Sequence, residues 1–326
     1  MDLSILIVNW KSAAYVRKCL RSLEANPIGM SVEIVVVDGG SFDECGEMIA
    51  KEFPYVKFVQ SPDNVGFGRS NNLAFSHSTG KTILLLNPDT EVCGDALRVL
   101  YEALQTLPNA GAVGAKLLNT DLSLQTSCVM AYPTVLNQAL DSEFLRARTR
   151  NSKLWGVQSL FNDSLEPSSI EAISGACVML HRAIFEQVGG FEPRYFMYGE
   201  DVDLSFKIHK AGYQLYYVPK AEIIHHGGGS SSGAKSTFST VMMRESVRLF
   251  LRLRRGPISA ALYSVFLGAS AVSRLALCSL KALAGGKKPS RSIPSINKWL
   301  AILRWSLGFE SWAATAGMPR TQTKTQ

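Results

Sequence analysis

Short, mostly apolar runs that end abruptly in polar residues recur through the first 240 positions of the chain. Runs of this kind are typical of strands buried on both faces of a sheet. Stretches with helical periodicity lie between them, and this alternation predicts βαβ units and a mostly parallel sheet in an α/β fold. The predicted strands are 3–8, 32–37, 56–60, 82–86, 112–117 and 213–218, and the predicted helices are 12–23, 43–53, 64–77, 95–107 and 197–210. Residues 140–168 are polar and weakly periodic, so they are interpreted as a variable insertion without assigned structure.

The apolar run 83–86 stands out because the polar turn Asn87-Pro88-Asp89 follows it directly. Ligands of open α/β sheets collect where the carboxyl ends of such strands emerge. A carboxylate at that place suits a hard divalent cation whose other ligands are phosphate oxygens. The alternative is a plain proline turn in which Asp89 caps a helix that starts near Gly94.

Three acids, Glu200, Asp201 and Asp203, lie within four residues at a predicted helix start. Acids there stabilise the positive end of the helix dipole, which explains some of them without any chemistry. The preceding residues 196–199 are Phe-Met-Tyr-Gly, which places a carboxylate against an aromatic and partly dry wall. Such surroundings raise the pKa of a carboxyl group and suit a general base.

Two further stretches carry candidate chemistry. His225 and His226 follow a short apolar strand and precede a Gly-Ser loop, and metal binding and a structural role both remain open for them. The small residues 174–176 (Ser-Gly-Ala) allow another group to approach the backbone closely. Residues 66–68 (Gly-Phe-Gly) do not form a dinucleotide fingerprint, because the third glycine is absent.

The charge of the chain is divided unevenly. Of 326 residues, 46% are hydrophobic, and the formal net charge is +7. Residues 1–240 carry a net charge of −5, whereas residues 241–326 hold 14 Lys and Arg against 2 acids, a net charge of +12. A basic tail with long apolar runs favours an anionic membrane surface over nucleic acid as its partner. The six cysteines form no CxxC pair and are expected to be reduced core residues of a cytosolic protein, and no signal peptide is expected.

The tail is predicted to be helical, with a polar and disordered end at 319–326. Arg244, Arg248, Arg252 and Arg255 fall on one helix face, and residues 257–273 carry no charge. Ser259, Tyr263, Ser270, Arg274 and Lys281 fall on one narrow stripe of the next helix, which favours a helix that lies in the membrane interface. Packing on the α/β part of the chain and membrane spanning are the alternatives.

Seven motifs resemble those of family 2 glycosyltransferases, and more narrowly the bacterial rhamnosyltransferase-like branch. In order they are 36–38 (Val-Val-Asp), 64–68 (Asn-Val-Gly-Phe-Gly), 86–89 (Leu-Asn-Pro-Asp), 174–176, 189–191 (Gly-Gly-Phe), 199–203 (Gly-Glu-Asp-Val-Asp) and 225–226 (His-His). The resemblance covers roughly residues 2–235 and implies a GT-A nucleotide-sugar transferase fold there, with a basic helical extension over 236–326.

The resemblance also implies roles for single residues. Asp201, with Glu200 beside it, matches the catalytic base, and Asp89 matches the metal-binding motif, in which Asn87 replaces the usual first aspartate. His225 matches a position that completes the coordination of Mg²⁺ or Mn²⁺, and His226 is the competing choice. The residues expected to bind the nucleotide sugar are Asn9, Asp38, Gly66, Arg69, Asn87 and Gly175. The turn 38–41 lacks the asparagine that usually follows Asp38.

These expectations amount to an inverting, metal-dependent glycosyltransferase in cell-surface polysaccharide synthesis. The expected donor is dTDP-rhamnose, and the expected acceptor is a glycan or a lipid-linked precursor at the cytoplasmic face of the membrane. Transfer of a galactofuranose, another hexose or an amino sugar is the alternative within the class. A non-catalytic nucleotide- or carbohydrate-binding protein on the same fold is the alternative outside it.

Overall fold

The computed structural model describes residues 1–139, 164–227, 237–283 and 293–316. Most of the insertion expected at 140–168, the Gly-Ser loop after His226 and the chain end at 319–326 lie outside the described residues. The strands are β1 (Leu3–Asn9), β2 (Val32–Asp38), β3 (Lys57–Gln60), β4 (Thr82–Leu86), β5 (Thr90–Val92), β6 (Ala110–Leu118), β7 (Val129–Met130), β8 (Ser168–Ile170), β9 (Ala172–Ile173), β10 (Cys177–His181) and β11 (Gln214–His225). The helices are α1 (Ala13–Ala25), α2 (Cys45–Glu52), α3 (Phe67–Ser76), α4 (Ala96–Thr106), the 3₁₀ turn η1 (Thr126–Cys128), α5 (Val135–Ala139), α7 (Arg182–Gln187), α8 (Glu200–Lys210), α9 (Thr237–Arg255), α10 (Pro257–Leu283), α11 (Ile293–Ser306) and α12 (Trp312–Thr315).

The described part of the chain contains one large sheet in the order β3-β2-β1-β4-β10-β6-β11-β5, with β8 paired to β11. Strands β3, β2, β1 and β4 run parallel, as do β6 and β11, whereas β10 is antiparallel between β4 and β6. All residues of β1 and β4 are buried, because their mostly apolar runs are covered on both faces. The predicted α/β fold with a mostly parallel core is confirmed.

Two local features differ from the expectations. The helix predicted at 95–107 is confirmed as α4, but residues 90–92 form β5, which pairs with the end of β11, so Asp89 does not cap that helix. The runs predicted as a strand at 213–218 and a separate segment at 223–226 are one strand, β11. It pairs with β6 along its length, with a register shift between Val218 and Glu222. Strand pairing therefore joins segments that the local pattern separates.

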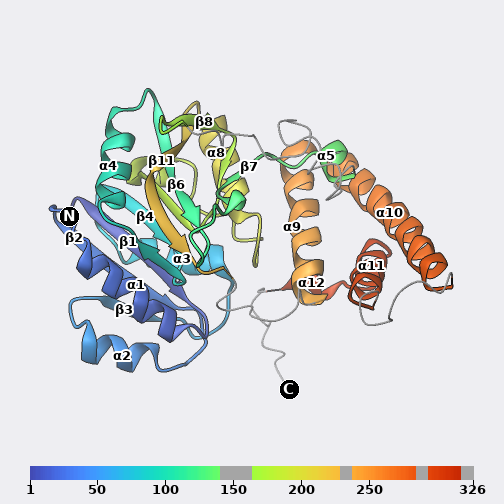
Figure 1. Ribbon diagram of the computed structural model, residues 1–326, viewed down its shortest axis with the longest axis horizontal. Helices are drawn as coiled ribbons and strands as arrows, with labels where there is room; N and C mark the ends of the chain where they lie inside the picture. Colours follow the sequence, from blue (N-terminus) through green and yellow to red (C-terminus); the bar gives the residue numbers. More distant parts are fainter. Residues whose placement is uncertain (140–163, 228–236, 284–292, 317–326) are drawn as a thin grey trace, which may run out of the picture.

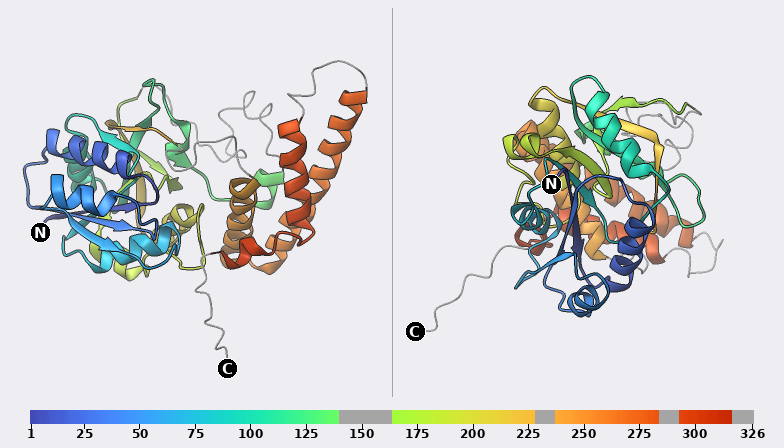
Figure 2. Two further views of the ribbon diagram at one scale, coloured as in Figure 1. Left: turned by 90° about the horizontal axis from the view of Figure 1, so that it is seen from below. Right: turned by 90° about the vertical axis from the view of Figure 1, so that its left-hand side faces the viewer.

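The tail forms a second layer of helices beside the sheet domain (Figure 1), and the view from below shows the same division (Figure 2). Helix α9 lies nearest the sheet domain, and its Phe250 is buried against Tyr132, Tyr195 and Val202. Helices α10 and α11 pack on α9 and on one another around Tyr263 and Trp305. Helix α5 also packs on α10, so residues 135–139 join the tail although they precede it by about a hundred positions.

The arginine stripe of α9 does not form one open basic face. Arg248 binds Glu245 and lies with its guanidinium carbon 5.4 Å from the Trp305 ring centroid, while Arg244 is half-buried. Only Arg252 and Arg255 of the predicted stripe are exposed. Arg244 and Arg248 therefore contribute to packing within the tail and not to an exposed basic surface.

Helix α10 turns two residues of its polar stripe toward α11. Tyr263 is 1% exposed and contacts Trp305 edge-on, and Arg274 lies over the Trp299 ring at 4.4 Å. A different face of α10 is apolar and exposed. The exposed apolar side chains are Ile258, Leu262, Val265, Phe266, Val272, Leu277 and Leu280. Of the described helices, one span, Pro257–Leu280, is long and apolar enough to cross a membrane by length and composition.

All six cysteines are free, as the sequence predicts. Cys19, Cys45, Cys128 and Cys177 are buried, and the structure places them in the main apolar core.

Candidate active site

The carboxyl end of β4 meets the start of β10 at the centre of the sheet. The backbone N–H of Asn87, one residue past β4, donates to the carbonyl oxygen of Ala176 at 2.9 Å. This bond links the Asn87-Pro88-Asp89 turn to the small residues 174–176 on the neighbouring strand. Two groups of candidate residues that are far apart in the sequence thus lie next to one another at the carboxyl end of β4, where ligands of such folds collect.

Asp89 and His225 form the first pair at this end of β4. Strand β5 pairs with the end of β11, with Thr90 opposite His225, and this register brings the two side chains together. His225 Nε2 lies 3.3 Å from Asp89 Oδ1 and 3.4 Å from Asn87 Nδ2. On its other side, His225 Nδ1 lies 2.6 Å from Gln125 Oε1. Because the Gln125 oxygen can only accept, Nδ1 carries the proton and Nε2 presents its lone pair toward Asp89.

His226 has a different environment. Its Nε2 lies 2.6 Å from Glu91 Oε1 and its Nδ1 lies 3.0 Å from Thr120 Oγ1, so both ring nitrogens have partners. Its backbone N–H donates to the carbonyl oxygen of Asp89 at 2.9 Å. The structure therefore favours His225 over His226 as the group that faces the Asp89 side chain, and gives His226 a bracing role.

The donor atoms around Asp89 fit a divalent cation that is completed by substrate. Asp89 is 8% exposed, and Asn87 Oδ1 is buried with no hydrogen-bond partner among the described residues. Carboxylate oxygen, amide oxygen and imidazole nitrogen are all acceptable ligands for Mn²⁺. Mg²⁺ prefers the oxygen ligands among them. Within the described ranges, no group of three or more His, Cys, Asp or Glu side chains is placed to hold a metal ion. Diphosphate oxygens and water would therefore have to supply the remaining ligands.

Glu200 and Asp201 are the first two residues of α8. They lie on the side of the Asn87–Ala176 hydrogen bond that is opposite to Asp89. Gly199, with φ of 76°, occupies the N-cap position, so the helix begins directly with the two acids. Asp201 Oδ2 accepts the backbone N–H of Gly175 at 2.9 Å, and Oδ1 accepts that of Val202 at 2.8 Å. A Cβ on Gly175 would lie 3.3 Å from the Asp201 Cβ, so the small residue permits this close approach. Glu200, Asp201 and Asp203 all lie in the first turn of α8, as the sequence predicts, but no side chain caps the helix at Gly199.

The two carboxyl groups differ in protonation. Burial, and secondly the charge of the neighbouring Asp201, raise the pKa of Glu200 to about 8. Glu200 is 6% exposed, and its Oε2 has no hydrogen-bond partner among the described residues. Burial also raises the pKa of Asp201, but the backbone N–H groups of Gly175 and Val202 oppose that rise. Asp201 is therefore the member of the pair that carries the charge near neutral pH, and Glu200 holds a proton.

Asp38 lies at the end of β2 and is surrounded by internal donors. Asn9 Nδ2 donates to its Oδ1 at 2.8 Å, and Gln60 Nε2 and the Phe42 N–H donate to its Oδ2 at 2.6 and 2.9 Å. Ser41 adds bonds from its hydroxyl and its backbone N–H. Burial alone would raise the pKa of Asp38, but these bonds outweigh it and lower the pKa. The carboxylate stays ionised and fixes the turn 38–42, and its contact with a nucleotide remains a prediction.

Gly66 and Arg69, both expected to bind the nucleotide sugar, contact the segment that leads into α8. A Cβ on Gly66 would lie 2.1 Å from the carbonyl oxygen of Phe196, and the N–H of Phe67 donates to that oxygen at 3.0 Å. Arg69 Nε donates to the Pro193 carbonyl at 2.6 Å. The structure gives both residues a supporting role, and their contact with substrate stays a prediction.

Sequence reasoning missed several partners of the site residues. Gln125 orients His225, Gln60 holds Asp38, and Arg254 of α9 binds Asp203 in α8. None of the three stands in a motif, and each is far in sequence from the residue that it contacts. No local signal marks them, so only the folded chain reveals these pairs.

Comparison with known proteins follows this geometry. Residues 4–189 match the family model described as glycosyl transferase family 2. The chain belongs to glycosyl transferase family 2. Residues 158–227 also match a model described as the N-terminal domain of galactosyltransferase.

The curated relatives of this family 2 glycosyltransferase include rhamnosyltransferases. N-acetylglucosaminyl-diphospho-decaprenol L-rhamnosyltransferase of Mycobacterium tuberculosis is 28% identical over 242 residues, which cover 70% of this chain and 77% of that protein. Rhamnosyltransferase WbbL of Escherichia coli is 27% identical over 230 residues, covering 68% and 82%. The chain is thus a rhamnosyltransferase-like glycosyltransferase, and a purely non-catalytic binding role is set aside.

Solved structures show the fold of this glycosyltransferase. Mannosyltransferase PcManGT of Pyrobaculum calidifontis, solved with GDP-Man and Mn²⁺, is similar with a TM-score of 0.56 at 15% identity, covering 94% of this chain and 87% of that one. GalNAc-T7, solved with UDP, GalNAc and Mn²⁺, has a TM-score of 0.53 at 16% identity, covering 78% and 51%. The predicted GT-A fold is confirmed.

Proposed function

We propose that this protein is an inverting glycosyltransferase that moves a sugar, rhamnose from dTDP-rhamnose, onto a lipid-linked glycan precursor. The observation that carries the proposal is the bond from the Asn87 N–H to the Ala176 carbonyl at 2.9 Å. It joins the Asp89–His225 pair, suited to a metal diphosphate, to Asp201, suited to a base. A leaving nucleotide and an attacking hydroxyl need these two functions side by side.

Each side chain has a role that its surroundings support. Asp201, held as an anion by two backbone N–H groups, accepts the proton of the acceptor hydroxyl as that oxygen attacks the anomeric carbon. Attack from the face opposite the nucleotide inverts the configuration at that carbon. Glu200, protonated near neutral pH, is able to donate a hydrogen bond to a sugar hydroxyl. A divalent cation, Mg²⁺ or Mn²⁺, bound by Asp89 and His225 would neutralise charge on the departing diphosphate.

The choice of donor and acceptor is supported by relatives. Two of them are named as rhamnosyltransferases, and the name of one contains a diphospho-decaprenol acceptor. A hexosyltransferase of Haloferax volcanii, 24% identical, supports another hexose as the alternative donor sugar. The test is to incubate the purified protein with a panel of nucleotide sugars and Mn²⁺ and to measure free nucleotide. Turnover with dTDP-rhamnose alone supports the proposal, and turnover only with another donor overturns the choice of rhamnose.

We also propose that α10 lies in the plane of an anionic bilayer at the cytoplasmic face, where a lipid-linked acceptor resides. Its outward face is apolar from Ile258 to Leu280, and Tyr263 and Arg274 of its polar stripe face α11. Basic residues flank the apolar helix in sequence on both sides, at 252–255 and at 281–291. Positive charge at both ends favours one membrane side for both ends, hence a helix that lies flat rather than spans. Packing on α9 and α11 along one side also opposes spanning.

A flotation assay tests the membrane surface. The double variant Val265→Glu/Phe266→Glu changes side chains that are 68% and 50% exposed, so it leaves the interior intact. Wild type should float with vesicles that contain anionic lipid, and the variant should lose at least ten-fold in bound fraction. Leu122→Glu, at 63% exposure in the sheet domain, is the matched control and should float like wild type. Equal flotation of wild type and the double variant, or a concentration-dependent dimer that the variant abolishes, overturns the proposal.

A further inference from the structure

The tail helix α9 is fastened to the helix that carries Asp201. Arg254 Nε donates to Asp203 Oδ1 at 2.7 Å, and Arg254 Nη2 donates to Asp203 Oδ2 at 2.8 Å. Asp203 is fully buried and lies in the first turn of α8, two residues after Asp201. The Tyr195 hydroxyl also donates to Asp203 Oδ1 at 3.4 Å. A bidentate pair of this kind fixes direction as well as distance.

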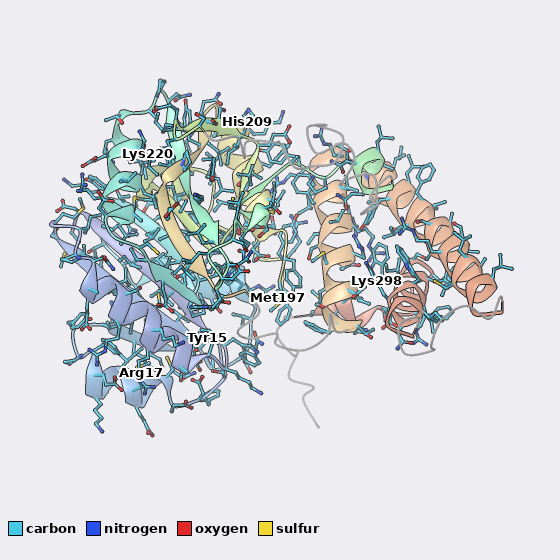
Figure 3. The ribbon with its side chains drawn as sticks, in the orientation of Figure 1. Tyr15, Arg17, Met197, His209, Lys220 and Lys298 are labelled. Atoms are coloured by element: carbon cyan, nitrogen blue, oxygen red, sulfur yellow. The ribbon has the colours of Figure 1, made fainter. Side chains whose placement is uncertain are left out.

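A second contact from α9 holds the turn just before α8. Ser246 Oγ donates to the carbonyl oxygen of Met197 at 2.9 Å, and Met197 lies on the side of the sheet domain that faces α9 (Figure 3). Tyr198 and Gly199 follow with φ of 70° and 76°. For the tyrosine this left-handed conformation is unfavourable, so other contacts must impose it. The strained turn sets the direction in which α8 leaves it.

The same turn is held from the opposite side by α3. The Phe67 N–H donates to the Phe196 carbonyl, and Gly66 packs directly against that carbonyl. Segment 196–199 is therefore held by contacts from two sides. One side is α3, which belongs to the sheet domain, and the other is α9, which belongs to the tail. Asp201 follows this segment within two residues. We therefore expect the position of Asp201 against Gly175 to depend on the contacts from both α3 and α9.

We propose that Arg254 is a positioning residue for sugar transfer, which holds the first turn of α8 so that Asp201 stays against Gly175. The inference rests on the proposed role of Asp201 as base. An Asp203 without its arginine would be an unpaired carboxylate, fully buried two residues from the charged Asp201, and repulsion between the two would displace the turn. A displacement of about 1 Å at a reacting group can cost on the order of 10²-fold in rate. On this basis α9 belongs to the catalytic unit, and a division of the chain at residue 235 separates parts that work together.

Steady-state kinetics of full-length variants, with donor binding and melting temperature measured on the same samples, test the proposal. Arg254→Met should lower kcat by 30–100-fold while the donor Kd and the binding stoichiometry stay as in wild type. Arg254→Lys keeps the charge without the two-pronged geometry and should recover part of that loss. Ser246→Ala removes a single bond and should lower kcat by 3–10-fold, which keeps the test usable if Arg254→Met fails to fold.

Arg98→Ala is the matched control, because Arg98 also makes two bonds to carboxylate oxygens, one to Asp95 and one to Glu102, but on the exposed side of α4. It should leave kcat unchanged. The proposal is overturned if the Arg254→Lys and Ser246→Ala variants both melt at lower temperatures but keep the wild-type kcat per donor-binding site. That result would show a purely structural role. Asp201→Asn distinguishes failure of the proposed base from failure of the positioning role. Full turnover of Asp201→Asn refutes the proposed base. If Asp201→Asn is inactive and the Arg254 variants are fully active, only the positioning role is refuted.

Discussion

The backbone N–H of Gly175 donates to Asp201 Oδ2 over 2.9 Å, and this bond brings the start of α8 against the loop before β10. The loop is bonded in turn to Asn87 at the end of β4. The arrangement places the Asp201 carboxylate on the loop that is bonded to the turn holding Asp89. It also explains why a residue without a side chain stands at 175, because a larger one would push against Asp201.

Asp201→Asn should abolish transfer and spare donor binding. The amide cannot accept the proton of the acceptor hydroxyl, and a positioned base contributes on the order of 10²–10⁴ in rate. The donor does not need that proton transfer in order to bind. Kinetics and calorimetric titration of the donor check the two halves of the prediction. Turnover near the wild-type rate would show that Asp201 is not the base.

Asp89→Ala should weaken metal-dependent binding of the donor, and removal of metal with EDTA should have the same effect on wild type. Gln125→Ala should weaken it by about 10–100-fold, because the residue that orients a metal-binding histidine fixes its tautomer. Gln214→Ala is the control, since that side chain accepts only an exposed bond from Ser169. Donor affinity is measured with and without Mn²⁺. Indifference of the enzyme to EDTA and to added metal would contradict the metal site.

Glu200→Gln should stabilise the protein at alkaline pH and change little near pH 5. Below pH about 4.5, the folded and unfolded chains both hold the Glu200 proton. Between about 4.5 and about 8, only the folded protein holds it, so the stability of wild type falls as pH rises. The glutamine cannot ionise, and its advantage should grow over this interval to a few kcal/mol on the order of the pKa shift. Melting curves from pH 5 to 9 measure it, and parallel curves for both proteins would refute the buried, protonated Glu200.

Gly66→Ala should destabilise the protein severely and Gly94→Ala only mildly. Both glycines have positive φ, 89° and 53°, so both alanines pay roughly 1–2 kcal/mol for the left-handed conformation. At Gly66 the new Cβ would also lie 2.1 Å from the Phe196 carbonyl oxygen, whereas nothing lies within 4 Å at Gly94. Melting temperatures of the two variants compare the effects. Similar melting temperatures would show that the grip of α3 on segment 196–199 is weaker than the contact implies.

The sequence by itself determined the mainly parallel α/β character of the sheet domain and pointed to the candidate site residues. Wholly apolar runs such as 83–86 predict buried strands, because only full coverage on both faces stabilises them, and the acids at 200–203 mark the start of α8. These signals lie within a few residues of one another, so the local pattern contains them. The contrast between His225 and His226 was left open, because two adjacent histidines look alike until strand pairing decides which side chain faces Asp89.

Only the tertiary structure decided the contacts between distant segments. The pairs Gln125–His225, Gly175–Asp201 and Arg254–Asp203 join residues that are 100, 26 and 51 positions apart. The outward face of α10 was likewise decided by the tertiary structure. Its polar stripe could face water or a partner helix with the same periodicity, and the aromatic rings of α11 settled that Tyr263 and Arg274 of the stripe turn inward. Periodicity reports which residues share a face of a helix, whereas packing against neighbouring elements determines where that face points.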